Sequence, residues 1–471
     1  MNKDKSVYGR VCDLITYGNI HLSADTADNA YLYKTLLARL NLPLEECGGC
    51  ISDSADLEGM TGPDGLLSHF DANDREPLIA ALLPLPSRLN ELFNSFLEHN
   101  EAYEGTEWFY DLCVKSGYVR AAASENNIHW RLKGEKGELQ ITINTCVPYY
   151  NDCRYDSPRC PSCEGADGSL IRREIPLRIN NEDWAFMFSP YNLFPRHFIF
   201  CPAGHTAGKV DTGTYAALLD AVECFNHYFF AANADVSGLC KYDNSHACFT
   251  GGLAALPMFS AAPRMLFDDP GGFVKISVLD WYNTVIRLES GQRHAILGMA
   301  ERITQGWERF ADKKTGIANK PADRNNGIAP VIRINGDGEY CAELILRNNK
   351  LPRPDETLVG GGIGVLESLG AFVLDGAVSK AAAAACSILC GDNLEKGLEK
   401  AAKDKELKPY IGLIKDMVAN GACETAEKDI ERYIETACEN ALKSTAVFKD
   451  DGAGNMALIN FMASMNLNLK R

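Results

Sequence analysis

The spacing of apolar residues changes along this chain, and that change limits the fold class more than any other feature. In the first hundred residues apolar side chains recur at helical spacing, as in residues 30–40 and again near residues 88–97. From about residue 125 the period falls to two, and Leu139, Ile141 and Ile143 alternate with polar residues as in a half-buried strand. The chain therefore begins with helices and continues with strands.

Strands and helices then mix in two successive stretches. The first has strand-like runs and an amphipathic helix, and the second, from about residue 273, has further strand-like runs and a helical tail. The runs are strand-like at residues 184–188, 198–201, 274–279 and 343–346, and helical at 215–225 and 429–443. This order predicts an α+β fold with antiparallel sheet. We expect a helical region over residues 1–124, one half over 125–268 and a second half with the helical tail over 269–471.

Composition narrows the choice of partner and compartment. The chain has 471 residues, of which 46% are apolar, and a net charge of −16. Because phosphate contacts need a basic face, this charge argues against nucleic acid as the main partner, although a phosphorylated small molecule needs only a local cluster of donors. The first ten residues are polar and the apolar run 381–390 is too short to span a bilayer, so we expect neither a signal peptide nor a membrane partner. Seventeen cysteines then indicate a reducing, cytoplasmic compartment.

A Cys-x-x-Cys turn at Cys160 and Cys163 places two thiolates on one side of a knuckle, as a tetrahedral zinc site requires. One pair is an incomplete site, and two ordinary loop cysteines are the alternative. A second pair, Cys47 and Cys50, could complete a four-cysteine site. Histidines offer a competing completion, and the candidates are His129, His197, His205, His227 and His246.

A second motif is Asn233-Ala-Asp235, followed by Ser245-His246-Ala-Cys248-Phe-Thr250-Gly-Gly. On an extended segment, residues two apart point to the same face, so His246 could bind a metal while Cys248 attacks a substrate. The alternative is a structural histidine beside a glycine pair.

At this motif the chain resembles the second, largely bacterial class of galactose-1-phosphate uridylyltransferases, in which the corresponding run is Ser-His-Asp-His-Phe-Gln-Gly-Gly at the same distance from Asn-Ala-Asp. Other stretches resemble that family in the same order, and the resemblance covers nearly the whole chain. They are residues 139–144, 173–177, 189–200, 224–235, 285–288, 346–349, 363–370 and 446–449.

The resemblance implies a fold like that of the histidine-triad superfamily, in two related halves, and a homodimer. It also implies transfer of a uridylyl group between hexose-1-phosphates. In the family the second His of His-x-His attacks the α-phosphorus of UDP-glucose, which splits one difficult displacement into two easier ones. Nearby backbone and amide donors stabilise the phosphate charge.

Carried over residue by residue, the resemblance implies a structural zinc ion held by Cys160, Cys163, His205 and His246, with His197 as the reserve ligand. It implies that Asn233, Lys241 and Ser245 contact the substrate. The partner would be a nucleotide sugar or a sugar phosphate.

The chain departs from the family where the chemistry should be. Cys248 stands at the nucleophile position, Ala247 replaces an acid, and Thr250 replaces the amide donor. Lys241 and Tyr242 fall where the family has a Gly-Gly-Ser phosphate loop, and glycines there let the backbone approach a phosphate. The stretch 350–357 lacks the histidines that the family has there.

The sequence is compatible with two functions. In the first, the protein is a nucleotidyl or phosphoryl transferase that uses Cys248 or a nucleophile supplied by substrate. A thiolate is a strong nucleophile, but an ordinary thiol has a pKa of about 8.5 and is only a few per cent ionised at neutral pH. In the second, the protein is a non-catalytic relative that binds a nucleotide or a partner protein.

Overall fold

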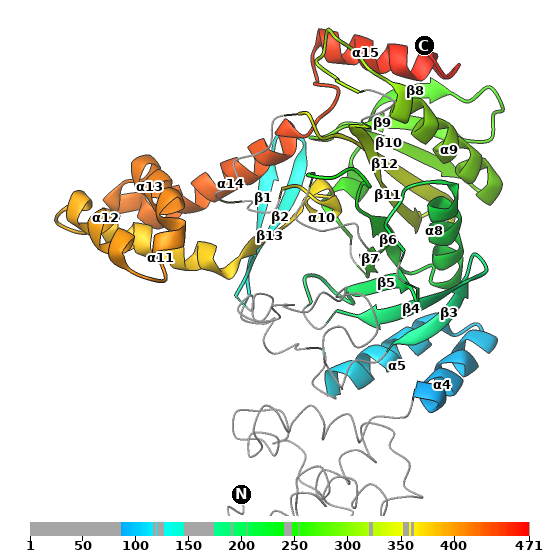
Figure 1. The fold of residues 1–471 in the computed structure, drawn as a ribbon, viewed down its shortest axis with the longest axis horizontal. Helices are drawn as coiled ribbons and strands as arrows, with labels where there is room; N and C mark the ends of the chain where they lie inside the picture. Colours follow the sequence, from blue (N-terminus) through cyan, green and yellow to red (C-terminus); the bar gives the residue numbers. More distant parts are fainter. Residues whose placement is uncertain are drawn as a thin grey trace, which may run out of the picture. The chain divides into compact units, whose positions relative to one another are not determined.

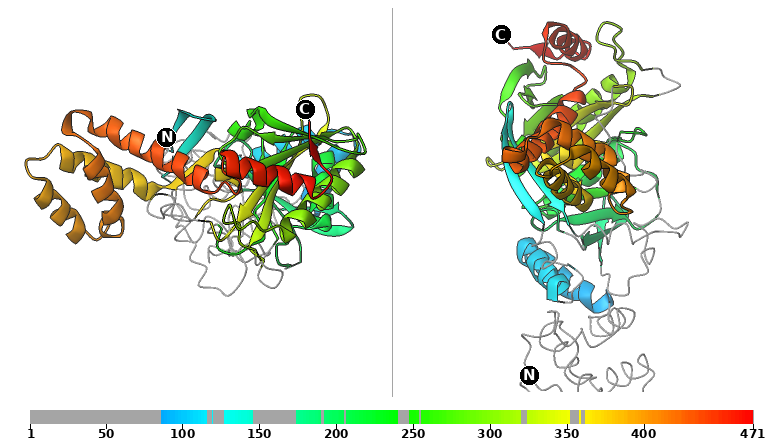
Figure 2. Two further views of the ribbon diagram at one scale, coloured as in Figure 1. Left: turned by 90° about the horizontal axis from the view of Figure 1, so that it is seen from above. Right: turned by 90° about the vertical axis from the view of Figure 1, so that its left-hand side faces the viewer.

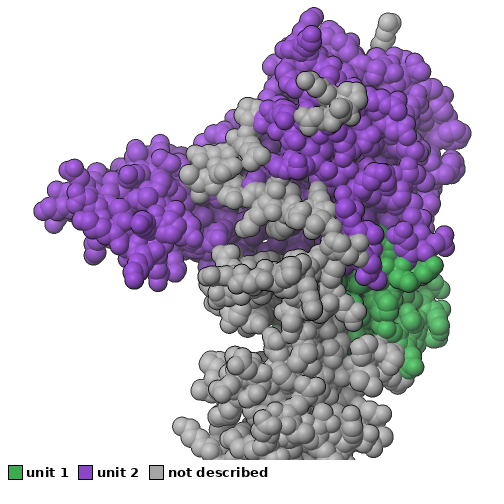
Figure 3. Space-filling view, viewed as in Figure 1, with its two compact units in different colours: residues 1–121, 155–178, 183–192 green, residues 122–154, 179–182, 193–471 purple. Residues whose placement is uncertain are grey.

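The computed structural model describes residues 86–115, 119, 127–145, 174–189, 192–204, 206–239, 247–253, 255–319, 324–351, 358 and 362–470. The chain divides into two compact units, coloured separately in Figure 3. Unit 1 takes in residues 1–121, 155–178 and 183–192, and unit 2 takes in residues 122–154, 179–182 and 193–471.

Two helices and two strands make up the described part of unit 1. They are α4 (Pro86–Glu98), α5 (Ala102–Lys115), β3 (Ile175–Ile179, of which Ile179 is counted in unit 2) and β4 (Glu182–Phe188, of which Glu182 is counted in unit 2). Phe109 of α5 is fully buried, and its ring lies 5.4 Å from Phe188 and 6.2 Å from Phe93, measured between centroids. These aromatic contacts join both helices to β4. The predicted helix near residues 88–97 is thus confirmed as α4.

A large antiparallel sheet forms the body of unit 2, with its strands in the order β14-β8-β9-β10-β12-β11-β6-β7-β5 (Figure 1). The strands are β5 (Phe198–Pro202), β6 (Phe229–Ala232), β7 (Phe249–Gly252), β8 (Pro263–Asp268), β9 (Lys275–Leu279), β10 (Val285–Ser290), β11 (Asn326–Ile334), β12 (Tyr340–Asn348) and β14 (Asn468–Leu469). Each pair of neighbours is antiparallel.

The order of these strands repeats around the middle of the sheet. Along the chain, β5, α8 (Thr212–Cys224), β6 and β7 have the same sequence of element types as β10, α9 (Arg293–Arg309), β11 and β12. Across the sheet, β5-β7-β6 is followed by β11-β12-β10 in reverse, with β6 and β11 paired at the centre through Ala231 and Val331. In this arrangement β12 takes the place that β7 takes on the other side.

Each face of the central strands is covered. Helices α8 and α9 pack against each other and against the sheet, and Trp307 of α9 donates its indole N–H to the carbonyls of Gly327 and Arg347. On the opposite face, Val285 and Val331 belong to a buried cluster shared with a second, smaller sheet. Strands β10 to β12 are therefore largely buried on both faces.

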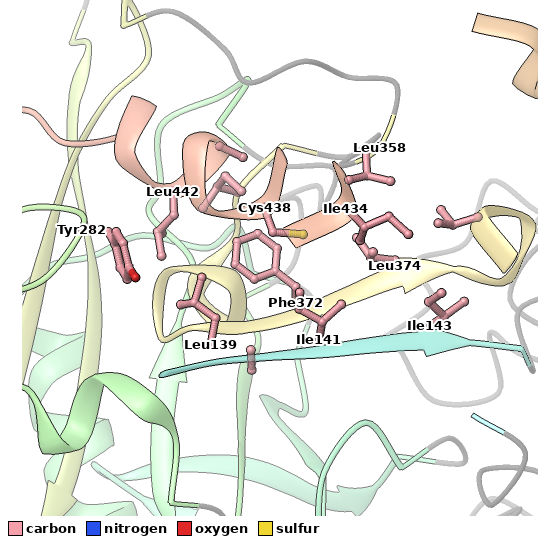
Figure 4. Packing of buried hydrophobic residues seen from close by; sticks show 14 of the residues in the cluster. Leu139, Ile141, Ile143, Tyr282, Leu358, Phe372, Leu374, Ile434, Cys438 and Leu442 are labelled. Atoms are coloured by element: carbon pink, nitrogen blue, oxygen red, sulfur yellow. The ribbon is translucent and has the colours of Figure 1, made fainter. Parts of the chain in front are cut away.

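The smaller sheet consists of β1 (Ile128–Gly134), β2 (Gly137–Asn144) and β13 (Ala371–Asp375). Strands β1 and β2 are antiparallel, whereas β13 runs parallel to β2. Figure 4 shows Ile434 and Cys438 of the long helix α14 (Ala426–Ser444) packing toward Phe372 and Ile141 of this sheet. The alternation predicted for residues 139, 141 and 143 is confirmed, since all three side chains are buried.

Helices dominate the C-terminal part of unit 2. The elements are η3 (Pro257–Ser260), α10 (Val365–Ser368), α11 (Gly376–Leu389), α12 (Leu394–Lys403), η4 (Lys408–Tyr410), α13 (Ile411–Asn420), η5 (Cys423–Thr425), α14 (Ala426–Ser444) and α15 (Gly452–Ala463). Helices α11 to α14 pack together at one end of unit 2, and we call them the helical lobe (Figures 1 and 2). None of the helices in the described ranges is long and apolar enough to cross a membrane.

The predicted α+β class with a large antiparallel sheet is confirmed. Strands from both predicted halves share that one sheet, and the boundaries at residues 124 and 268 stay predictions. The helix expected over residues 30–40 lies outside the described residues.

Candidate functional site

The short strand β7 carries the candidate chemistry. It lies between β5 and β6, and Thr250 pairs with Ile199 on one side and Ala231 on the other. Side chains alternate along a strand, so Cys248 and Thr250 share the face that also carries Ala231 and Val331, away from α8 and α9. Both are partly exposed, whereas Phe249 is buried on the other face against Phe200.

The two glycines that follow Thr250 are explained by close contacts on opposite faces. A Cβ at Gly251 would lie 2.1 Å from the carbonyl oxygen of Phe229. A Cβ at Gly252 would lie 2.6 Å from Phe194 Cε2 and 2.9 Å from the carbonyl oxygen of Pro195. Gly252 thus allows the segment before β5 to cross over β7, where the N–H of Leu253 donates to Pro195.

The segment that crosses over β7 also carries His197, whose side chain contacts Thr250. His197 is buried, and its Nε2 lies 3.0 Å from the hydroxyl oxygen of Thr250. Its ring also contacts Phe194, with centroids 4.6 Å apart. A buried imidazole that shares a hydrogen bond with a side chain fixes the orientation of that side chain. The Thr250 hydroxyl is therefore already engaged within the protein.

Asn233 and Cys248 lie just beyond the paired ends of β6 and β7. The register pairs Ala231 with Thr250 and Ala232 with Phe249, so Asn233 follows β6 at the end of the pair where Cys248 precedes β7. The Asn233 side-chain oxygen accepts a 2.8 Å hydrogen bond from the N–H of Val365, the first residue of α10. The structure thus places Asn233 and Cys248 at the same end of the β6–β7 pair.

Asp235, the last residue of Asn-Ala-Asp, has a structural role. Its side chain is 3% exposed, forms an ion pair with Arg324 at 2.7 Å and accepts a hydrogen bond from the N–H of Val210 at 3.0 Å. These contacts tie the segment after β6 to the segments before α8 and β11.

The counterpart strand β12 carries a different set of residues at the corresponding place in the sheet. Glu343 is fully buried and accepts hydrogen bonds from Arg287 at 3.1 Å and Arg333 at 2.8 Å. Arg287 also donates to carbonyls of η3, and Arg333 lies 4.6 Å from the ring centre of Phe259. This half of the face is closed by the ion-pair cluster and by η3.

Cys341 lies two residues before Glu343, as Cys248 lies two before Thr250. It is fully buried, and burial followed by the nearby Glu343 carboxylate raises the pKa of its thiol well above the ordinary value. A thiol held protonated in this way is a poor nucleophile. Cys248, which immediately precedes β7, is partly exposed, whereas Cys341 on β12 is buried.

Comparisons with known proteins find similarity to one family of enzymes. Residues 52–150 match the family model for the N-terminal domain of galactose-1-phosphate uridyl transferase. The galactose-1-phosphate uridylyltransferase of Caldanaerobacter subterraneus subsp. tengcongensis is 29% identical over 429 residues, covering 82% of each chain. That of Bifidobacterium longum subsp. longum is 28% identical and covers 94% of this chain and 95% of its own. Over most of its length the chain is thus similar to galactose-1-phosphate uridylyltransferases. A solved structure of yeast Ap4A phosphorylase Apa2 with AMP covers 58% of this chain and 87% of its own at 8% identity and a TM-score of 0.36, which is too low to support a conclusion.

Several residues predicted from the galactose-1-phosphate uridylyltransferase resemblance lie outside the described residues. They are the four zinc ligands Cys160, Cys163, His205 and His246 and the substrate contacts Lys241 and Ser245. Within the part of the chain that the structure describes, no three His, Cys, Asp or Glu side chains group so as to hold a metal ion. The zinc site and its ligands therefore stay predictions.

Sequence reasoning did not predict the observed roles of three residues near the uridylyltransferase motif, which are His197, Arg324 and Val365. His197 was named only as a reserve ligand, and its contact with Thr250 comes from pairing between strands far apart in sequence. Arg324 and Val365 are more than 80 residues from their partners. Glu343 was a sequence signal that could have indicated the buried ion-pair cluster, because it is an acidic residue inside the apolar run 341–346.

Proposed function

We propose that this protein binds a nucleotide sugar and a hexose-1-phosphate in the manner of galactose-1-phosphate uridylyltransferases, and that it transfers the uridylyl group poorly. The main support is the arrangement on β7. By the family resemblance Cys248 stands at the nucleophile position, and it immediately precedes β7 at the end of the β6–β7 pair where Asn233 follows β6. UDP-glucose is the substrate that the family resemblance favours, and galactose-1-phosphate is the acceptor.

The transfer would take place in two balanced steps. The Cys248 thiolate attacks the α-phosphorus of UDP-glucose, the bond to the bridging oxygen breaks, and glucose-1-phosphate leaves. The resulting S-uridylyl cysteine is attacked by a phosphate oxygen of galactose-1-phosphate, which yields UDP-galactose and restores the thiolate. A histidine attacks as the neutral imidazole, whereas a cysteine must first lose its proton.

The surroundings of Cys248 support slow turnover. The Thr250 hydroxyl is hydrogen-bonded to His197, and the Asn233 oxygen is hydrogen-bonded to the backbone of α10. Donors that stabilise transition-state charge must be aimed at the substrate when the charge develops. The same observation favours the second candidate function, which is binding of a nucleotide sugar without catalysis.

A structural zinc ion and a homodimer belong to the same proposal. Cys160, Cys163, His205 and His246 make a two-cysteine, two-histidine set, which suits tetrahedral zinc. The zinc ion would fix the segment that leads into β7, because His246 precedes Cys248 by two residues. In the family resemblance the active form is dimeric and the compartment is cytoplasmic.

Intact-protein mass spectrometry after incubation with UDP-glucose tests the proposal. A uridylyl adduct that is lost in Cys248→Ala supports slow transfer through the thiol. No adduct, together with UDP binding by calorimetry in both proteins, supports the non-catalytic function. Absence of both adduct and binding would overturn the proposal.

A further inference from the structure

Two exposed cysteines meet in the helical lobe, far along the chain from the β7 motif. Cys390 ends α11 and Cys423 begins η5. Both are exposed free thiols, and Cys390 Sγ lies 3.5 Å from the carbonyl oxygen of Cys423, across 33 residues of sequence. A hydrogen bond with Cys423 is the main cause that raises the pKa of Cys390.

The approach of these two residues is determined by the packing beneath them. A Cβ at Gly421 would lie 2.7 Å from Leu389 Cδ1, so the glycine lets the end of α13 come close to the end of α11. On one side the Cys390 N–H donates to the carbonyl of Cys386 within α11. On the other, Asp429 of α14 accepts hydrogen bonds from the Ala422 N–H at 3.0 Å and the Thr425 hydroxyl at 2.7 Å. Both cysteines are therefore held by contacts that do not depend on their sulfur atoms.

We propose that Cys390 and Cys423 are a redox modification site, at which a small-molecule disulfide oxidises the two thiols to a reversible disulfide. One thiolate attacks the oxidant and releases one thiol, and the second protein thiolate then displaces the other. The protein loses two protons and two electrons, and the oxidant takes them up to become two thiols. Such exchange needs thiols that are close together and accessible; both cysteines are exposed, and the Cys390 Sγ contacts the backbone of Cys423.

The disulfide would close a loop that contains α12 and α13. Because a crosslink restricts the unfolded loop, the oxidised lobe should open less often than the reduced lobe. In a reducing compartment such a bond is transient, which is typical of redox-sensing pairs. Cys386, one turn earlier on α11, is partly buried and does not join the pair in a three-ligand metal site within the described residues.

The test uses the full-length protein treated with glutathione disulfide, followed by non-reducing digestion and mass spectrometry. We expect one peptide pair linked through Cys390 and Cys423, released by dithiothreitol. The link should be absent in Cys390→Ser and in Cys423→Ser and should persist in the matched control Cys386→Ser. Phenylarsine oxide, which bridges two nearby thiols with loss of water, should label the wild type and the control but neither of the other two variants at this place.

A second measurement tests whether the disulfide makes the helical lobe open less often. Limited proteolysis between residues 390 and 423 should slow several-fold on oxidation and recover with dithiothreitol. The proposal is overturned if Cys390 and Cys423 each become glutathionylated without linking to each other, if Cys390 links to Cys386 instead, or if the linked form is cut as fast as the reduced form.

Discussion

At the scale of single residues, the face of β7 is built by contacts that sequence spacing does not reveal. Cys248 and Thr250 share a face because they are two apart on a strand, and that much follows from the sequence. The pairing of Thr250 with His197 depends on the segment before β5 crossing over Gly252. Two substitutions test this local account.

Thr250→Val should destabilise the protein. The change keeps the shape of the side chain but removes the hydroxyl that meets buried His197. Loss of one partner in a buried hydrogen bond costs about 1–3 kcal/mol in the free energy of unfolding. Urea denaturation measures this, and Thr250→Ser, which keeps the hydroxyl, should stay close to wild type. Equal stability of the valine and serine variants would show that the contact contributes nothing.

Gly252→Ala should also destabilise, by about 1–3 kcal/mol, because its Cβ would push against Phe194 and the Pro195 carbonyl. Gly298 in α9 is the matched control, since an added Cβ there meets nothing within 4 Å. In a helix interior, Gly298→Ala should instead stabilise by about 0.5–1 kcal/mol. Thermal unfolding of both variants checks the prediction, and a neutral Gly252→Ala would mean that the crossing segment is not held closely.

At the scale of elements, the sheet explains why only one of two similar strands can carry a site. Strands β7 and β12 occupy corresponding positions, and each has a cysteine two residues before a polar side chain. On β12 that polar residue is Glu343, paired with two arginines and fully buried. On β7 it is Thr250, partly exposed. The difference could not be predicted from either strand alone, because the arginines come from β10 and β11.

The junction between α13 and α14 should be sensitive to acid. The Thr425 hydroxyl, followed by the Ala422 N–H, lowers the pKa of Asp429. A lowered pKa in the folded state gives stability that is present above the unfolded value of about 3.9 and lost as the pH falls through the folded value. Hydrogen exchange in the first turn of α14 should therefore be slower in wild type than in Asp429→Asn above about pH 4, and the difference should shrink below it. A difference that does not change with pH would contradict this account.

At the scale of the whole molecule, the sequence predicted the fold class and several of the described elements. Periodicity located α4, β2, α8 and α14, because each buries one regular face. It did not predict that β13 would pair in parallel with β2, since more than 200 residues separate them. It also did not reveal the repeated strand order, because the pairing of β6 with β11 at the centre of the sheet is a long-range contact. The division into two related, histidine-triad-like halves stays an expectation from the resemblance.

Metal content tests the part of the proposal that lies outside the described residues. We expect about one zinc ion per chain in the purified protein, because the predicted ligand set is tetrahedral and complete. Cys160→Ser should lose most of the zinc, whereas Cys153→Ser, a nearby cysteine outside the predicted set, should keep it. Elemental analysis that finds no zinc in the wild type would remove this part of the proposal.

The central claim is that a galactose-1-phosphate uridylyltransferase framework here carries a weakened nucleophile site. The most direct measurement is the rate of uridylyl exchange between UDP-glucose and galactose-1-phosphate, for wild type beside the double variant Cys248→His, Thr250→Gln. Loss of one donor aimed at transition-state charge typically costs a factor of about 10² to 10³, and loss of the imidazole nucleophile removes much of what remains. We predict very slow exchange by the wild type and a faster rate for the double variant. Exchange by the wild type at ordinary enzyme rates would contradict the claim and would establish Cys248 as an effective nucleophile.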